Sequence, residues 1–173
     1  MQKAIIGGGC FWCVEAVFTR AKGIISAMSG YAGGRRPNPS YEQICTGATG
    51  HAEIVTITFD ETVISYEDIL DIFFEIHDPT TLNRQGGDAG TQYRSVIFYL
   101  NDEQKDAAEA KIEELQHFLP STIVTELSPA PEIYDAEGYH QDYLTHNPNQ
   151  GYCQAVVSPK VQKFMMKFKD FIK

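Results

Sequence analysis

Apolar residues in the N-terminal third of the chain fall into short runs and periodic stripes. Residues 3–7 are typical of a short buried strand that ends in a glycine turn. The apolar positions that follow are spaced i, i+3, i+4, i+7, and they are Val14, Val17, Phe18 and Ala21. This stripe predicts a helix that begins close to Cys10–Cys13 and is closed by Gly23, and residues 24–31 predict a second strand.

Apolar and polar residues alternate over residues 53–59, which predicts a strand with two distinct faces. One face carries Glu53, Val55, Ile57 and Phe59. Ser65 followed by Asp68 resembles a capping box, so a helix is expected to begin there. The other predicted elements are a strand over 93–100, a helix from 101 to about 118, a strand near 122–127, a short helical piece near 139–144 and an amphipathic helix after Pro159.

Two long segments, residues 32–50 and 77–92, carry many turn residues and too little periodicity for a regular element. Loops of this length in a compact domain are often functional. The element order β-α-β-β-α-β predicts an α+β fold, a ferredoxin-like split βαβ two-layer sandwich with long loops. We expect a single catalytic domain over 1–173, with a core at about 3–128 and an irregular C-terminal extension, 129–173, that carries Cys153.

Composition and charge narrow the possible partners. The 14 basic and 23 acidic residues give a net charge of −9, which disfavours nucleic acid and anionic membranes. No apolar run reaches the ~20 residues of a membrane span, and the N-terminus offers no signal-peptide core. Four cysteines in such a chain make a poor disulfide framework, so the reducing cytoplasm is the expected location. No metal or cofactor is predicted, and a monomer is expected.

The stretch GGGCFWC, residues 7–13, is the strongest candidate for chemistry. A thiol at a helix N-terminus faces unpaired N–H groups, so we expect the Cys10 pKa to be lowered. Half a zinc site is disfavoured because Cys45 and Cys153 are isolated and no histidine forms a short-spaced pair with a cysteine. A thioredoxin fold is disfavoured because only one short strand precedes the cysteine pair, but dithiol chemistry remains open.

Glu53 adds an independent candidate. On the apolar face of its strand its carboxyl would be desolvated, which raises the pKa and suits a general acid. The alternative is that Glu53 lies at the strand edge and turns to water. Taken singly, Asp88 is a turn cap, Tyr41 and Tyr93 are packing residues, and His51 and His140 are polar structural residues. Sequence position alone leaves these alternatives open.

Several stretches together resemble one family. Gly9-Cys10-Phe11-Trp12 after a short strand is similar to the A-type peptide methionine sulfoxide reductases, which act on the S epimer. Other stretches match the same family in order and spacing, and they are Gly30–Gly34, Asn38–Tyr41, Gly50–Glu53, His77–Thr81, Asp88–Ser95 and His140–Tyr143. They cover nearly all of the chain from Lys3 onward.

The resemblance implies a role for each matching position. It makes Cys10 the nucleophile that attacks the sulfoxide sulfur, and Glu53 the group that protonates the sulfoxide oxygen. The implied supporting residues are Tyr41 and Tyr93 as donors to that oxygen, Phe11 and Trp12 as the pocket for the S-methyl group, and Asp88 as a holder of the site's hydrogen bonds and water. Attack leaves Cys10 as a sulfenic acid, which a second thiol must resolve. The implied substrate is methionine-S-sulfoxide, free or in oxidised proteins under repair.

The resolving thiol is the open point. The family commonly places it in the C-terminal tail, which favours Cys153, and the disulfide would be reduced by thioredoxin. The chain departs from the commoner pattern at Cys13, where glycine is usual, so Cys13 could close directly on Cys10 or receive the disulfide from Cys153. Cys45 is expected to be a spectator. The rival functions are a general thiol-disulfide oxidoreductase that uses Cys10–Cys13 and, more remotely, a module that only binds methionine-like side chains.

Overall fold

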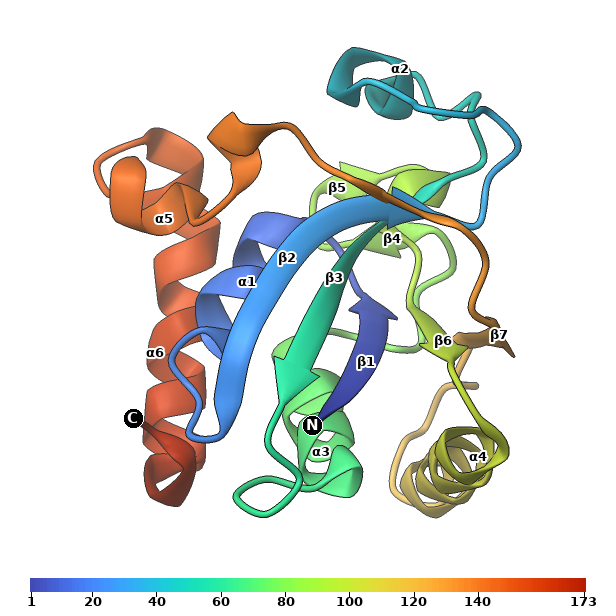
Figure 1. Ribbon diagram of the computed structural model, residues 1–173, viewed down its shortest axis with the longest axis vertical. Helices are drawn as coiled ribbons and strands as arrows, with labels where there is room; N and C mark the ends of the chain where they lie inside the picture. The colour runs from blue at the N-terminus through green and yellow to red at the C-terminus, as the bar shows by residue number, and fades with distance from the viewer.

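A mixed, curled sheet of six strands forms the centre of the computed structural model, which describes residues 1–173 (Figure 1). In chain order the strands are β1 (Gln2–Gly7), β2 (Ile24–Ala32), β3 (Ala52–Phe59), β6 (Val96–Tyr99), β7 (Glu126–Pro129) and β8 (Ile133–Asp135). Across the sheet they lie in the order β7-β6-β1-β3-β2-β8. Only β6 and β7 are parallel neighbours, and every other adjacent pair is antiparallel.

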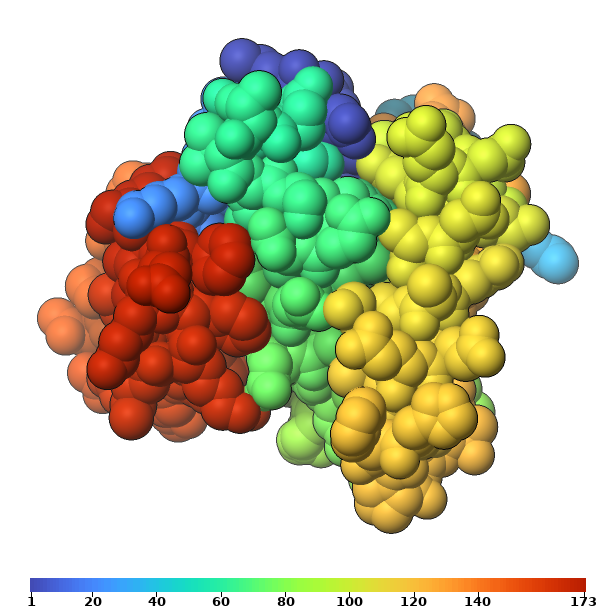
Figure 2. Space-filling view, turned by 90° about the horizontal axis from the view of Figure 1, so that it is seen from below, coloured from blue at the N-terminus to red at the C-terminus, as the bar shows by residue number.

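Helices cover the sheet and link its strands. They are α1 (Phe11–Phe18), α2 (Tyr41–Cys45), α3 (Tyr66–Ile76), α4 (Asp102–Gln116), α5 (Tyr143–His146) and α6 (Ser158–Lys167). The largest apolar cluster, 32 buried residues, joins side chains of α1, α3 and α6 to one face of the sheet. Figure 2 shows α3 between α4 and α6 on the underside of the molecule. The central elements keep the predicted order β1-α1-β2-β3-α3-β6.

The segment 32–50 is more regular than predicted. It contains α2, which begins with a capping box in which the Ser40 hydroxyl accepts from Gln43 N–H and the Gln43 side chain accepts from Ser40 N–H. Buried Ile44 anchors this short helix to the core. The prediction of an irregular loop was therefore wrong for these five residues.

The segment 77–92 also contains regular structure. Strands β4 (Arg84–Gln85) and β5 (Asp88–Ala89) form a hairpin, and Thr91–Tyr93 is a 3₁₀ turn. The strand predicted over 93–100 begins only at Val96, because Tyr93 N–H is already bonded to Gly90 O within that turn. The strand predicted near 122–127 lies at 126–129 instead.

The C-terminal extension is ordered rather than irregular. Its strand β8 pairs with β2, so the extension completes one edge of the main sheet. A 3₁₀ turn (Gly138–His140) and α5 follow, and a π-helical turn (Cys153–Val157) leads directly into α6. Cys153 is fully buried in that turn, which corrects the prediction that it lies between irregular segments. No helix is long and apolar enough to cross a membrane.

Candidate active site

The glycine run before α1 lets the chain turn sharply against a buried histidine. Gly9 has φ +83°, and a Cβ on Gly8 would lie 2.7 Å from His77 Cδ2. The His77 ring is held by Ser95 Oγ at 2.7 Å and by Phe73 O, and burial lowers its pKa to about 4. The neutral ring therefore acts as a packing surface that fixes the turn. Cys10 follows at the N-cap of α1.

The two cysteines of this turn lie one helical turn apart, and Cys13 N–H donates to Cys10 O at 3.1 Å. Cys10 is 7% exposed and Cys13 is 1% exposed. Burial raises the pKa of Cys10 well above its ordinary value, and the nearby Trp12 N–H offsets this only in part. The pKa of Cys13 is lowered, first by the hydrogen bond from Cys10 and also by the Lys160 ammonium. The expectation that the helix N-terminus lowers the Cys10 pKa was therefore wrong, because desolvation dominates.

Glu53 lies against the start of the same helix. It is the second residue of β3, is 1% exposed, and its Oε1 accepts a hydrogen bond from Phe11 N–H at 3.0 Å. Its Oε2 is buried without a hydrogen-bond partner. Burial raises the pKa of Glu53 to about 8, so the carboxyl is protonated at neutral pH. The structure thus favours the buried arrangement over the alternative in which Glu53 turns to water.

Two tyrosines from different elements lie near the Glu53 carboxyl. Tyr41 is the first residue of α2 and Tyr93 ends the 3₁₀ turn, and both are half-buried. Burial raises the pKa of each phenol, and the proximity of Glu53 raises it further. Both hydroxyls therefore remain protonated and able to donate.

Asp88 approaches from the β4–β5 hairpin. Its carboxylate accepts a 2.5 Å hydrogen bond from the hydroxyl of Tyr152, the residue before Cys153.

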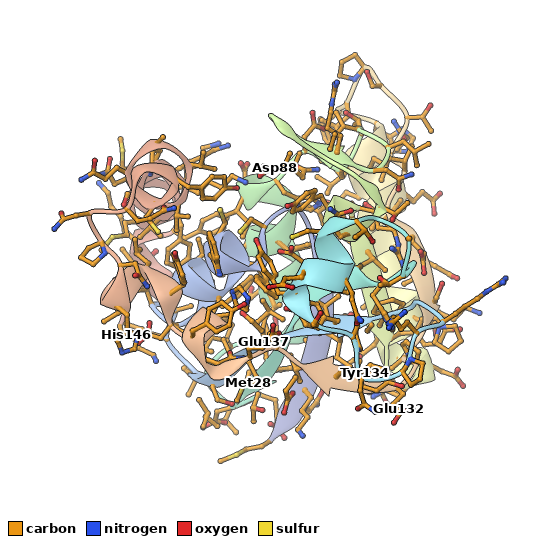
Figure 3. All side chains as sticks on the ribbon, turned by 90° about the horizontal axis from the view of Figure 1, so that it is seen from above. Met28, Asp88, Glu132, Tyr134, Glu137 and His146 are labelled. Atoms are coloured by element: carbon orange, nitrogen blue, oxygen red, sulfur yellow. The ribbon has the colours of Figure 1, made fainter.

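Glu137 lies on the other side of the site: in the view from above, α1 and α2 lie between Asp88 and Glu137 (Figure 3). The Glu137 carboxylate accepts from the Tyr31 hydroxyl at 2.9 Å and from Tyr41 N–H at 3.0 Å, so it holds the start of α2. Glu137 and Tyr152 were not predicted as site residues.

An aromatic wall lines the side of the site formed by α1. Phe11 is buried, and Trp12 is half-buried and stacks on Tyr143 with ring centroids 3.8 Å apart and planes 5° apart. Trp12 Nε1 donates to His140 Nδ1 at 3.0 Å, and His140 also packs 4.2 Å from the Tyr41 ring. His140 belongs to the wall itself, and its Nε2 is buried without a hydrogen-bond partner. The wall thus combines α1 with the C-terminal extension.

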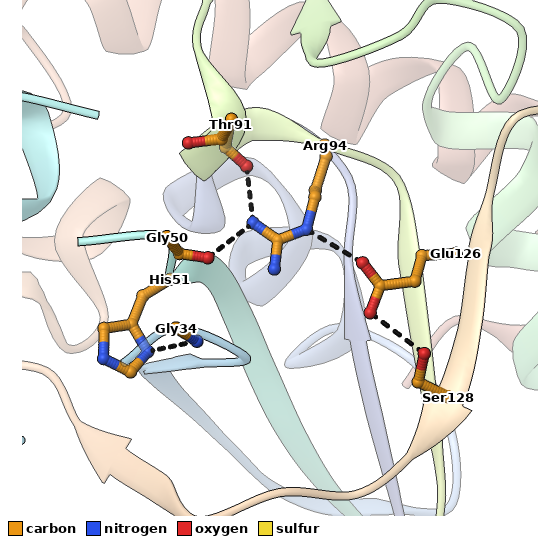
Figure 4. Close-up of polar contacts among 7 residues, drawn as sticks. All are labelled: Gly34, Gly50, His51, Thr91, Arg94, Glu126 and Ser128. Carbon is orange, nitrogen blue, oxygen red and sulfur yellow. Dashed lines mark hydrogen bonds and ion pairs between the residues drawn. The ribbon is translucent and has the colours of Figure 1, made fainter. Parts of the chain in front are cut away.

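An arginine joins the segments that carry the polar groups (Figure 4). Arg94 follows Tyr93 directly, and its Nη1 donates to Gly50 O at 3.0 Å and to Thr91 O at 2.9 Å. Its Nε pairs with Glu126 of β7 at 3.1 Å. Arg94 therefore links two segments to the edge strand β7: residue 50, which precedes β3 and Glu53, and the 3₁₀ turn that carries Tyr93.

His51, two residues before Glu53, is bonded on both ring nitrogens. Its Nδ1 accepts from Gly34 N–H at 2.9 Å (Figure 4), and its Nε2 lies 2.6 Å from Arg36 O. It therefore joins the approach to Glu53 to the segment that leads toward Tyr41, and it has a structural role as predicted.

The site therefore combines a thiol pair, a protonated carboxyl, two phenol donors and an aromatic wall. Such a set can supply a nucleophile and a proton to a small polar group carried by an apolar side chain. Cys45 is exposed at the end of α2, near Tyr41. No three His, Cys, Asp or Glu side chains cluster closely enough to hold a metal ion.

Comparisons with known proteins point to one family. The family model described as "Peptide methionine sulfoxide reductase" matches residues 2–171. The peptide methionine sulfoxide reductase MsrA of Saccharolobus solfataricus is 57% identical over 173 residues, which cover 100% of this chain and 98% of that protein.

Solved structures agree with the sequence comparison. The crystal structure of reduced Mxr1 from Saccharomyces cerevisiae has a TM-score of 0.80 and 37% identity, and the match covers 88% of each chain. A structure of Mxr1 in complex with Trx2 has a TM-score of 0.56 and 26% identity, and it covers 82% of this chain and 84% of that one.

Proposed function

The chain belongs to the A-type peptide methionine sulfoxide reductase family and is an enzyme that reduces methionine sulfoxide, and from this premise we propose that it acts on the S epimer through Cys10. The substrate is methionine-S-sulfoxide, free or in oxidised proteins under repair. The observation that carries the proposal is the buried Oε2 of Glu53, which has no partner of its own beside the Cys10 turn. A group in this position can protonate a substrate oxygen.

The proposed reaction transfers one oxygen atom to Cys10. Glu53 gives its proton to the sulfoxide oxygen, while Tyr41 and Tyr93 donate hydrogen bonds to it, which makes the sulfur electrophilic. The Cys10 thiol passes its proton to the Glu53 carboxylate as its sulfur attacks the sulfoxide sulfur. The S–O bond of the adduct then breaks as the hydroxyl moves to the Cys10 sulfur, which releases methionine and leaves Cys10 as a sulfenic acid and Glu53 protonated again. The sulfoxide gains two electrons and the thiol loses two, so the step balances without a cofactor.

Phe11 and Trp12 serve in this proposal as the pocket for the S-methyl group. They are the first two residues of α1 and directly follow Cys10. An apolar wall on one side and polar donors on the other would accept the methyl group and the oxygen of only one epimer. Asp88 supports the polar side through its bond to Tyr152.

For the resolving step, the packing favours Cys13 as the first partner. Cys13 lies one helical turn after Cys10, with its N–H bonded to Cys10 O at 3.1 Å, and its lowered pKa favours the thiolate that attacks a sulfenic acid. This attack forms the Cys10–Cys13 disulfide and releases water. Cys153 then attacks Cys13 by thiol–disulfide exchange, which frees the Cys10 thiol. This order replaces the sequence-based preference for Cys153, whose thiol is buried in the π-helical turn.

Thioredoxin is the proposed reductant of the final disulfide. The support is the solved complex of the related Mxr1 with Trx2 and the three-cysteine set of Cys10, Cys13 and Cys153. We retain the proposals of one catalytic domain over 1–173 and of a ferredoxin-like split βαβ core. The antiparallel order β6-β1-β3-β2 of the central strands supports the latter.

The epimer assignment is tested by a single-turnover assay. Enzyme mixed with one equivalent of a peptide containing either methionine-S-sulfoxide or methionine-R-sulfoxide, without reductant, should give methionine only from the S form. With thioredoxin and its reductase added, turnover of the S form should continue. Product from the R form at a comparable rate would refute the epimer assignment. Insulin disulfide reduction without any sulfoxide reduction would instead favour the general thiol-disulfide oxidoreductase.

The order of the thiols is tested by disulfide mapping. A sample quenched by acid and alkylation early in one turnover should contain the Cys10–Cys13 disulfide, and a later sample the Cys13–Cys153 disulfide. A Cys13→Ser variant should still release one methionine per enzyme but should accumulate the Cys10 sulfenic acid, detected by dimedone labelling. A direct Cys10–Cys153 disulfide in the early wild-type sample would show that Cys153 is the first resolver. Cys45→Ser serves as the matched control and should change neither product.

A further inference from the structure

Glu15 is the second buried carboxyl of the molecule, and it takes no part in the proposed reaction. It is 3% exposed, on α1, and none of the ion pairs of the structure includes it. Burial raises its pKa to about 7, against the effect of two hydrogen bonds that it accepts. A buried carboxyl without a cation is costly unless such bonds are made, so its partners identify what it does.

Those partners belong to the C-terminal extension and to β2. Glu15 Oε1 accepts from Asp142 N–H at 2.6 Å, and Oε2 accepts from the Ser29 hydroxyl at 3.0 Å. Ser29 in turn exchanges backbone bonds with the Gln141 side-chain amide, at 2.9 and 3.0 Å. The carboxyl therefore fixes two adjacent residues of the extension to α1 and β2.

Asp142 is held in a conformation that it would not adopt without support. Its φ of 53° and ψ of 43° lie in the left-handed region, which is unfavourable for a residue other than glycine unless local hydrogen bonds support it. The bond from its N–H to Glu15 compensates for this backbone strain. Asp142 is also the N-cap of α5, so its position sets where that helix begins.

The residues that flank this contact form half of the aromatic wall. Tyr143 follows Asp142 and stacks on Trp12, and His140 accepts the Trp12 indole N–H. Trp12 and Glu15 are three residues apart on α1 and so lie on the same side of that helix. One turn of α1 therefore contacts the segment 140–143 at two points, through the Glu15 carboxyl and through the Trp12 indole.

We propose that Glu15 is a positioning residue that docks the segment 140–143 on α1 and thereby orients Trp12 for the substrate. Its role goes beyond the proposed function, and it rests on that function only in that Trp12 forms part of the methyl pocket. Without the Glu15 contacts, Tyr143 and His140 lose their fixed position over the indole. Substrate binding then weakens more than the chemical step slows, because Glu15 does not contact the reacting atoms.

The chain offers a direct optical test, because Trp12 is its only tryptophan. In Glu15→Ala the indole should become more exposed, which should appear as a red-shifted emission and faster acrylamide quenching. KM for a methionine sulfoxide peptide should rise about tenfold while kcat changes little, as expected for the loss of buried hydrogen bonds that act only through binding. Glu15→Gln should restore both readouts, since its oxygen still accepts from Asp142 N–H and its amide can donate to Ser29 Oγ.

Controls separate this role from general destabilisation and from the proposed function. Glu113→Ala, at an exposed position of α4, should change neither readout. If Glu15→Ala does not fold, Ser29→Ala tests the same contact. It should show a smaller red shift and about a twofold rise in KM. Emission, quenching and KM equal to wild type in folded Glu15→Ala, or in Ser29→Ala where Glu15→Ala does not fold, would overturn the proposal. A wild-type protein inactive on sulfoxide would refute the proposed function, while the fluorescence comparison would still test the docking.

Discussion

A Cys10→Ser variant is expected to lose methionine sulfoxide reduction completely while it keeps its fold. The serine hydroxyl is a far weaker nucleophile than a thiol and cannot form the sulfenic acid that carries the oxygen away. The rate should fall by on the order of 10⁴ or more, as for other enzymes that lose their nucleophile. Release of methionine in a single turnover without reductant, followed by chromatography, gives the measurement.

We expect Cys10→Ser to keep the wild-type fold. Serine is close in size to cysteine and is a favoured N-cap residue, so α1 should begin at the same residue. Near-wild-type circular dichroism is therefore expected. Cys45→Ser is the matched control, since it makes the same chemical change at the exposed end of α2 and should leave the rate intact. Residual turnover of Cys10→Ser near the wild-type level would end the nucleophile assignment.

The sequence was most informative where local periodicity and burial agree. The strand over 53–59 has its predicted parity, since Val55, Ile57 and Phe59 join the large core cluster while Ile54 joins the smaller cluster on the other face. Parity is a local property of one strand, so it needs no knowledge of the neighbours. Glu53 lies on the same face of the strand as Val55, Ile57 and Phe59. Its carboxyl therefore points toward the first turn of α1, where it accepts from Phe11 N–H.

The errors come from two sources. The capping box of Ser40 and Gln43 was present in the sequence, and it was overlooked because its helix is only five residues long. The Cys10 pKa was misjudged because the helix dipole is visible in a sequence, whereas the depth at which the turn is buried is not. A residue 7% exposed loses more by desolvation than one backbone N–H returns.

The remaining site residues could not be predicted because their contacts join distant parts of the chain. Trp12 and His140 are 128 residues apart, and Glu15 and Asp142 are 127 apart. Each pair depends on β8 closing the edge of the sheet and on α6 packing against α1. The family resemblance includes His140–Tyr143, but it did not indicate that this segment lies over the indole.

Glu53→Gln is expected to slow sulfoxide reduction by about 10²–10⁴, the usual contribution of a positioned general acid. The amide oxygen can still accept from Phe11 N–H, so the turn at Cys10 should keep its geometry. The amide cannot give a proton to the sulfoxide oxygen, so the chemical step loses its acid. Single-turnover rates at saturating sulfoxide give the measurement, and a variant as fast as wild type would remove Glu53 from this role.

The same substitution should change how activity and stability depend on pH. The pKa of Glu53 in the folded protein, about 8, is above the ordinary value of 4.5, so folding favours the protonated carboxyl. Its contribution to the free energy of unfolding is fully present below about pH 4.5 and is lost as the pH rises through about 8. Wild-type single-turnover rates should therefore fall above pH 8, while those of Glu53→Gln should not fall for this reason.

Urea unfolding at pH 6 and pH 9 isolates the contribution of Glu53 to the free energy of unfolding. Wild type should lose more stability than Glu53→Gln between the two values, because only wild type must ionise a buried carboxyl there. Glu15, whose pKa burial raises to about 7, is present in both proteins, so its contribution cancels in the difference. Equal losses in the two proteins would mean that Glu53 does not titrate between pH 6 and pH 9, which would contradict a pKa of about 8. The stability difference therefore tests the acid independently of any rate.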